Sequence, residues 1–190
     1  MKSKYVLVLS VMLALTAVSA KANYDLLVKT TAVGTSLNAV FDVDGITKVD
    51  NTFLGQIKVN GTFLANVFNF GQNGPNVSPG LNGFLSAGTI NVPSGTLFGG
   101  SSATVQLFAF KGAATYDDAK LITGAKIGNA ASAVTLTLGG NNQLGDLNFI
   151  VPNLETMPGF TMSTVAAVPE PATLALGLFG AAGMLFRRRK

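Results

Sequence analysis

The feature that most constrains the fold is a series of short runs in which apolar and polar residues alternate, separated by turn-forming residues. One pair of runs, 56–59 and 62–70, is joined by Asn60 and Gly61. Alternation with a period of two places every second side chain on one face of a strand, and an Asn-Gly pair favours the tight turn of a β-hairpin. The chain is therefore expected to contain paired β-strands.

Further runs of this kind recur along the central region of the chain. They are 24–30, 37–43, 83–92, 103–111, 134–138 and 144–151. One short helical stretch, 115–121, has Thr115 in position to cap its N-terminus. The 13 phenylalanines indicate a packed core, because disordered chains are poor in aromatic residues. The pattern predicts an all-β fold, an antiparallel β-sandwich resembling a jelly roll.

The chain contains no cysteine and no histidine. This composition excludes disulfides, a cysteine nucleophile, a Ser-His-Asp triad and the usual zinc ligands. We therefore expect no catalytic residue, no metal, no cofactor and no enzymatic activity. A hydrolase that uses a pair of carboxylates is the alternative, although Glu155 is the only glutamate of the central region.

The net charge of +4 comes from the two ends of the chain. Residues 23–168 hold six lysines, no arginine and eight acidic residues, so that this part carries a charge of −2. Binding to nucleic acid requires clustered basic side chains that neutralise phosphates. The sequence therefore predicts no nucleic-acid partner.

Three aspartates around Gly45 resemble part of a calcium-binding loop. Aligning Gly45 with the invariant glycine of such a loop places Asp42 and Asp44 at ligand positions. Val40 and Asn51 then occupy two other positions that require an oxygen ligand and a bidentate glutamate. We therefore interpret the segment as a strand that ends in an Asp-Gly turn.

The N-terminal segment has the layout of a secretory signal peptide. Residues 1–4 carry two lysines, residues 5–18 are mostly apolar, and small residues precede Asn23. These three parts predict a signal helix within residues 1–22 that is removed by cleavage between Ala22 and Asn23, with Ala20 as the alternative site.

The last residues combine a Pro-Glu-Pro motif, an apolar stretch and a basic cluster. Pro169, Glu170 and Pro171 precede residues 172–186, which carry no charge. A helix of this length spans about 22 Å, which is shorter than the ~30 Å hydrocarbon core of a bilayer. It is predicted as a C-terminal transmembrane helix, transient or retained, with the basic cluster on the cytoplasmic side. The cluster consists of Arg187, Arg188, Arg189 and Lys190.

This order of parts resembles the PEP-CTERM sorting signal of Gram-negative bacteria. The resemblance implies processing by an exosortase, a membrane-embedded protease that recognises Pro169, Glu170 and Pro171, and a link to exopolysaccharide and biofilm. In this interpretation the basic cluster stops transfer through the membrane. The same tail occurs on some ice-binding proteins.

These segments divide the chain into a signal peptide at 1–22, a β-sandwich domain at 23–155, a linker at 156–167 and a sorting signal at 168–190. The expected protein is exported and non-catalytic. It is first an inner-membrane anchored precursor, and then lies at the cell surface or in the extracellular matrix. The alternatives for its domain are a carbohydrate-binding, ice-binding or adhesin module.

Overall fold

The computed structural model describes residues 22–30, 38–73, 76–77, 79–141 and 147–167. Residues 1–21 of the predicted signal helix, the Pro-Glu-Pro motif, the predicted transmembrane helix at 172–186 and the basic cluster lie outside the described residues. Across the described part of the chain, no helix is both long enough and apolar enough to cross a bilayer.

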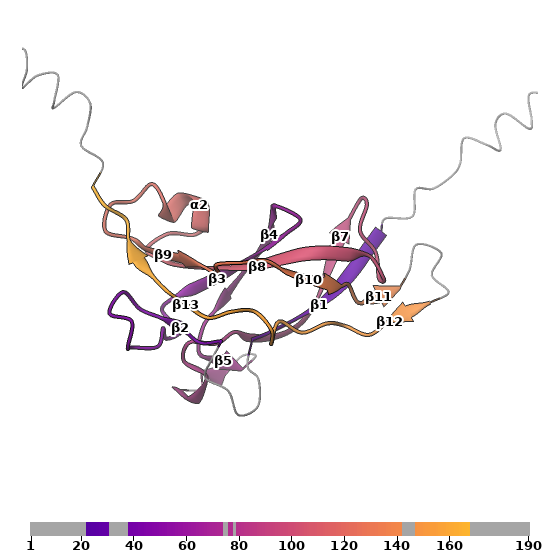
Figure 1. The fold of residues 1–190 in the computed structure, drawn as a ribbon, viewed down its shortest axis with the longest axis horizontal. Coiled ribbons are helices and arrows are strands. Elements are labelled where there is room, and N and C mark those ends of the chain that lie inside the picture. Colours follow the sequence, from indigo (N-terminus) through magenta and orange to yellow (C-terminus); the bar gives the residue numbers. More distant parts are fainter. Residues whose placement is uncertain (1–21, 31–37, 74–75, 78, 142–146, 168–190) are drawn as a thin grey trace, which may run out of the picture.

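The larger sheet has six strands, with β14, β9, β8, β3 and β4 in spatial order and β10 also paired with β8. All its pairings are antiparallel, and β8 is its central strand. Figure 1 shows β8 running along the middle of the molecule. The bounds of the strands are β3 Leu54–Val59, β4 Thr62–Asn69, β8 Ser102–Lys111, β9 Lys126–Asn129, β10 Val134–Thr137 and β14 Ser163–Thr164.

A second, two-stranded sheet consists of β1 (Ala22–Lys29) and β7 (Ser86–Ser94), which pair in antiparallel fashion. Its alternate side chains Tyr24, Leu26 and Val28 are buried in one cluster with apolar side chains of β3 and β8. This alternation arises because successive residues of a strand point to opposite faces. The two sheets therefore share one hydrophobic core, and the predicted all-β class is confirmed.

The hairpin predicted at Asn60 and Gly61 is confirmed. Asn60 has a φ of 46° and Gly61 a φ of 81°, so both central residues of the turn are left-handed. Val59 of β3 then pairs directly with Thr62 of β4. Left-handed residues at both positions give the turn a twist that matches the flanking strands, and Asn and Gly adopt this conformation most readily.

Several predicted runs form much shorter elements than expected. Run 37–43 contributes only β2 (Val40–Phe41), and run 144–151 only β12 (Asn148–Phe149), with residue 37 and residues 144–146 outside the described part. The short helix is confirmed as α2 (Tyr116–Ala119), capped by the Thr115 hydroxyl. The remaining short elements are β5 Gln72–Asn73, β6 Asn76–Val77, η1 Pro79–Leu81 and β11 Gly140–Asn141.

Residues 157–164 pack as part of the domain, in contrast to the linker predicted at 156–167. Strand β13 (Phe160–Thr161) pairs with β2 in parallel, which is a departure from a wholly antiparallel arrangement, and β14 pairs with β9. Met157 and Met162 are 1% and 3% exposed within the core cluster. The linker interpretation is therefore wrong for these residues, because their apolar side chains are buried by partners distant in sequence.

Candidate binding groove

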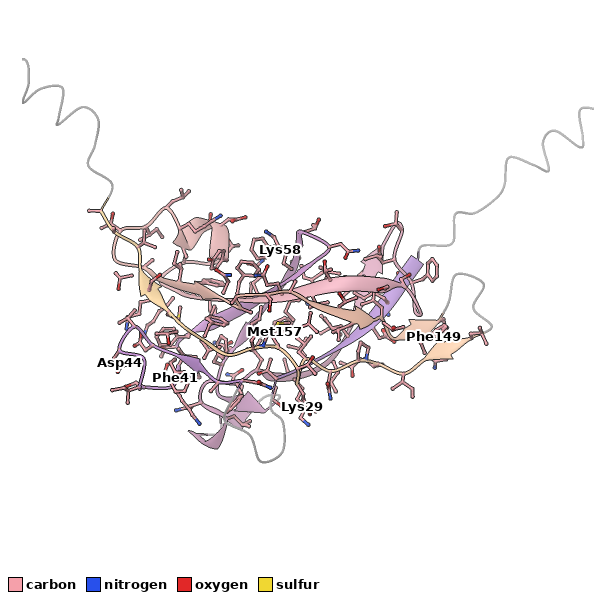
Figure 2. The ribbon with its side chains drawn as sticks, in the orientation of Figure 1. Lys29, Phe41, Asp44, Lys58, Phe149 and Met157 are labelled. Atoms are coloured by element: carbon pink, nitrogen blue, oxygen red, sulfur yellow. The ribbon has the colours of Figure 1, made fainter. Side chains whose placement is uncertain are left out.

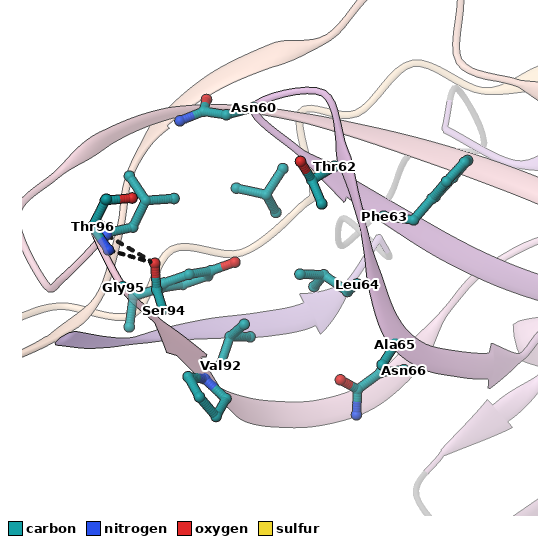
Figure 3. A pocket seen from close by; sticks show the side chains of 14 residues that line it. Asn60, Thr62, Phe63, Leu64, Ala65, Asn66, Val92, Ser94, Gly95 and Thr96 are labelled. Atoms are coloured by element: carbon teal, nitrogen blue, oxygen red, sulfur yellow. Dashed lines mark hydrogen bonds between the residues drawn. The ribbon is translucent and has the colours of Figure 1, made fainter. Parts of the chain in front are cut away.

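A groove of about 600 Å³ lies beside the β3–β4 hairpin. One wall is the first part of β4, and the other is the end of β7 with the turn that follows it. Figure 3 shows Thr62 and Asn66 on one side, with Ser94 and Thr96 on the other. Its apolar lining includes Tyr24, Val59, Phe63, Leu64, Val92 and Leu97. We call this cavity the hairpin groove.

The polar groups of the hairpin groove are neutral. The described residues that line it include hydroxyl and amide side chains but none that carries a charge. Asn60 and Ser94 already accept hydrogen bonds, from Thr104 and from the backbone N–H groups of Thr96 and Leu97. The side chains of Thr62 and Asn66 make no hydrogen bond to any described residue and are exposed. The groove therefore offers unpaired neutral donors and acceptors above an apolar floor.

A bulge in β4 shapes the groove wall. The β3–β4 register changes between Gln56, which pairs with Val67, and Lys58, which pairs with Phe63. This change leaves residues 64–66 without a direct partner, and Leu64 to Asn66 line the groove. Bulges bend a strand and re-aim its side chains, so the cavity depends on this irregularity.

The buried Gln56 side chain holds the bulge in place. Its Nε2 donates to the Leu64 carbonyl at 2.9 Å, and its Oε1 accepts from the Tyr116 N–H at 3.2 Å. Gln56 is 5% exposed. A single polar side chain thus ties the groove wall to the first turn of α2. Sequence reasoning missed this role, because Gln56 stands in an alternating run where a polar residue is expected to face solvent.

An aromatic cluster formed by residues of β4, β8 and α2 lies next to the groove. The rings of Phe63, Phe108 and Tyr116 pack edge-on or tilted, with centroids 4.7–5.8 Å apart. The Lys58 ammonium lies 4.6 Å from the centroid of the Phe63 ring, and Figure 2 shows Lys58 near the β4 hairpin. Burial raises the pKa of the Tyr116 hydroxyl and also that of Tyr24 in the groove. Both phenols therefore stay protonated at neutral pH and act as neutral groups.

The predicted turn at Asp44 and Gly45 is confirmed. The Asp44 carboxylate accepts hydrogen bonds from the Ile46 and Thr47 backbone N–H groups and from the Thr47 hydroxyl, at 2.5–2.9 Å. Asp42 instead forms an ion pair with Lys126 at 2.6 Å. The loop thus uses these two carboxylates to close its own turn and to tie it to β9. In the described residues, no group of three or more acidic side chains is placed to hold a metal ion.

The lowered pKa values of Asp44 and Asp50 predict that the folded domain is less stable in acid. Hydrogen bonds from Thr47 lower the pKa of Asp44, and those from Thr52 lower the pKa of Asp50. A lowered pKa in the folded state stabilises the fold above the unfolded pKa of about 3.9, and this contribution is lost as pH falls through the folded value. The melting temperature of residues 22–167 is therefore expected to drop below about pH 4. In the D44N/D50N variant the drop is expected to be smaller, and identical acid profiles would contradict the prediction.

Two other described carboxylates form ion pairs with lysines. Glu155 lies 3.1 Å from Lys29, and Asp117 lies 2.6 Å from Lys120. Hydrogen bonding to Asp117 raises the pKa of Lys120. Glu155 is the only glutamate of residues 23–168, and its ion pair links β1 to the segment before β13.

The predicted cleavage and sorting residues lie at the two ends of the described part of the chain. Pro169, Glu170, Pro171 and the basic cluster 187–190 lie outside the described residues. At the predicted cleavage site, Ala22 is the first residue of β1, and Asn23 pairs with Pro93. The described chain ends at Ala167, directly before the sorting residues.

A family model for the PEP-CTERM protein-sorting motif matches residues 167–190. No curated protein matches the chain, and no solved structure matches it. The motif is found on exported proteins that are membrane-anchored precursors before an exosortase sorts them to the cell surface. The chain therefore carries a PEP-CTERM protein-sorting motif at residues 167–190.

Proposed function

We propose that the exported domain is a non-catalytic, sandwich-type module that binds neutral polysaccharide in the hairpin groove, at the cell surface or in the extracellular matrix. The observation that carries this proposal is the chemistry of the groove. Its described lining is uncharged, and it combines hydroxyl and amide groups with aromatic and aliphatic side chains. Sugars present hydroxyl groups around apolar C–H faces, and sites with an apolar lining and a few polar groups suit such ligands.

The groove chemistry also favours binding over hydrolysis. Glycosidases generally place two carboxyl groups about 5–10 Å apart across the scissile bond. The described lining of the hairpin groove contains neither aspartate nor glutamate. A ligand held there would meet hydrogen-bonding groups and an apolar surface without an acid or a base to cleave it.

An ice-binding surface is the second candidate. Exposed hydroxyl side chains of β8 and β10 face one another in two cross-strand pairs, Thr104 with Thr135 and Ser102 with Thr137. Ice recognition would require a wide and regular array of hydroxyl groups. In the described sheet, the array on β8 and β10 consists of these two pairs. The small size of this array favours the polysaccharide proposal.

Glycan binding to residues 22–167 tests the proposal. We expect binding to an array of neutral polysaccharides, and we expect the T62V/N66A variant to bind about 10-fold more weakly, because each lost hydrogen bond contributes about 0.5–1.5 kcal/mol. The matched control is T135V/N148A, which changes one exposed threonine and one exposed asparagine outside the groove.

Equal affinity of the groove variant and the control variant would place the ligand elsewhere. Release of reducing sugar ends from a bound polysaccharide would contradict the non-catalytic proposal. Inhibition of ice growth by the wild-type domain, lost in T135V but not in T62V/N66A, would favour the second candidate.

A further inference from the structure

Exposed apolar side chains concentrate at one end of the domain. Four of the six large hydrophobic residues that are exposed in the described chain lie in two loops there. Leu121 and Ile122, in the loop between α2 and β9, are 84% and 44% exposed, and Ile46 in the Asp44 turn is 82% exposed. These side chains contact solvent, whereas core side chains contact neighbouring residues. We call the four residues Val43, Ile46, Leu121 and Ile122 the apolar end.

The last described strand segment is fixed to the apolar end. The Gly124 N–H donates to the Val165 carbonyl at 3.0 Å, and the Val165 N–H donates to the Ala125 carbonyl at 2.8 Å. A Cβ at Gly45 would lie 4.0 Å from the Thr161 side chain, so the other loop also borders this segment. Figure 1 shows α2, β2 and β13 at one end of the molecule, and Figure 2 places Asp44 at this end and Phe149 at the other.

The chain leaves the domain at this end, close to the sequence predicted to enter the membrane. Seven residue steps separate Val165 from residue 172, where the predicted membrane segment begins, and they span at most about 25 Å. Pro169 and Pro171 favour an extended backbone within this tether. A domain of this size has a radius of gyration of about 15 Å. The tether therefore keeps the apolar end near the bilayer surface for as long as the tail is inserted.

Two lysines beside the apolar end form ion pairs within the domain. Lys120 is paired with Asp117, and Lys126 with Asp42, both at 2.6 Å. These lysines already have carboxylate partners, so attraction to anionic lipid is not the expected driving force. Transfer of apolar side chains from water into the interfacial region is favourable without any charge.

We propose that the apolar end contacts the lipid surface in the membrane-anchored precursor, with Leu121 and Ile122 entering the interfacial region. This inference goes beyond polysaccharide binding, and it depends on insertion of the predicted segment 172–186. It gives the precursor a defined orientation, with the apolar end against the bilayer and the opposite end, near β12, directed away from it.

Lipid-borne quenching tests the proposal in the full chain. Because the chain has no cysteine, single cysteines can be introduced and labelled with an environment-sensitive fluorophore. The probe positions are Leu121→Cys at the apolar end and Ile150→Cys as the matched control, since Ile150 is also apolar and is 93% exposed. A third position, Ala181→Cys, reports insertion of the tail through a separate quencher that is attached to the lipid acyl chains. Each protein is exported in a Gram-negative host without exosortase and reconstituted in phosphatidylcholine vesicles.

We expect a quencher near the lipid headgroups to remove most of the emission at position 121 and little at position 150. With the fluorophore moved to Thr123→Cys, the exposed-site variant L121S/I122S is expected to lose the quenching that the parent shows. Equal quenching at 121 and 150 in vesicles where position 181 is quenched would overturn the proposal and leave tail insertion intact. Absence of quenching at position 181 would overturn both the lipid-contact proposal and the insertion of the tail. The glycan-binding test uses residues 22–167 alone, so its result does not depend on either outcome.

Discussion

A chain that ends at Glu155 is expected to lose its folded state, whereas one that ends at Ala167 is expected to keep it. The shorter chain lacks β13, β14 and the buried side chains Met157 and Met162. Burying a methionine side chain contributes about 1.5–3 kcal/mol, and two lost methionines approach the total stability of about 5–15 kcal/mol typical of a domain. The strand pairings with β2 and β9 are lost as well.

Urea denaturation and amide-proton spectra of the two chains measure this difference. Because the shorter chain is expected to be unfolded, a point variant supplies a graded result. The variant M162A is expected to lose about 2–5 kcal/mol, as large-to-small core substitutions do. Its control is T164A, an exposed residue two positions further on. A cooperative transition in the chain ending at Glu155, at the same urea concentration as the longer chain, would contradict this domain boundary.

Replacing Gln56 by leucine is expected to destabilise the domain by about 2–4 kcal/mol. Leucine is similar in size but leaves the Leu64 carbonyl and the Tyr116 N–H without the partner that the glutamine amide supplies. An unpaired polar group in a buried setting costs about 1–3 kcal/mol, and here there are two. The bulge in β4 is expected to relax at the same time, so Q56L should also weaken glycan binding in the hairpin groove.

Gln106 supplies the matched control for this substitution. Its Nε2 donates to one backbone carbonyl, that of Ala130, at 2.6 Å, and the side chain is half-buried. The variant Q106L is therefore expected to lose only about 1 kcal/mol and to keep its affinity for glycan. Urea midpoints for the two variants, measured with the same wild-type reference, give the comparison. Equal losses in Q56L and Q106L would show that Gln56 has no special role.

The parts of the fold that could be predicted from the sequence are those encoded locally. The hairpin at Asn60 and Gly61 follows from two adjacent alternating runs and a turn that only certain residues favour. The helix at Tyr116–Ala119 follows from Thr115 as its cap. In both cases the partners lie within a few residues, so a short window holds the whole signal.

The two-residue strands β13 and β14 could not be predicted, because their partners are far away in sequence. Residues 160–161 pair with residues 40–41, and residues 163–164 pair with residues 126–127. A segment as short as this has no periodicity to read, and Pro158 with Gly159 indicates a loop. The signal that was available was apolar: Met157, Phe160 and Met162 are three large side chains in a segment predicted to be a linker.

The hairpin groove was not predictable either, because its walls come from β4 and from the end of β7. Nothing in the sequence near Thr62 or Asn66 indicates that Ser94 and Thr96 lie opposite them. The sorting residues, in contrast, form one continuous pattern of a Pro-Glu-Pro motif, an apolar stretch and a basic cluster. A pattern of this kind needs no tertiary structure to be recognised.

The measurement that tests the central claim most directly is the mass of the exported protein in isogenic hosts with and without exosortase. In the host with exosortase we expect a product cleaved near Pro169–Pro171, which has lost the basic cluster 187–190. In the host without it, and for the P169A/E170A/P171A variant in either host, we expect the chain to extend to Lys190. An intact Arg187–Lys190 terminus of the wild-type protein in both hosts would contradict sorting by exosortase.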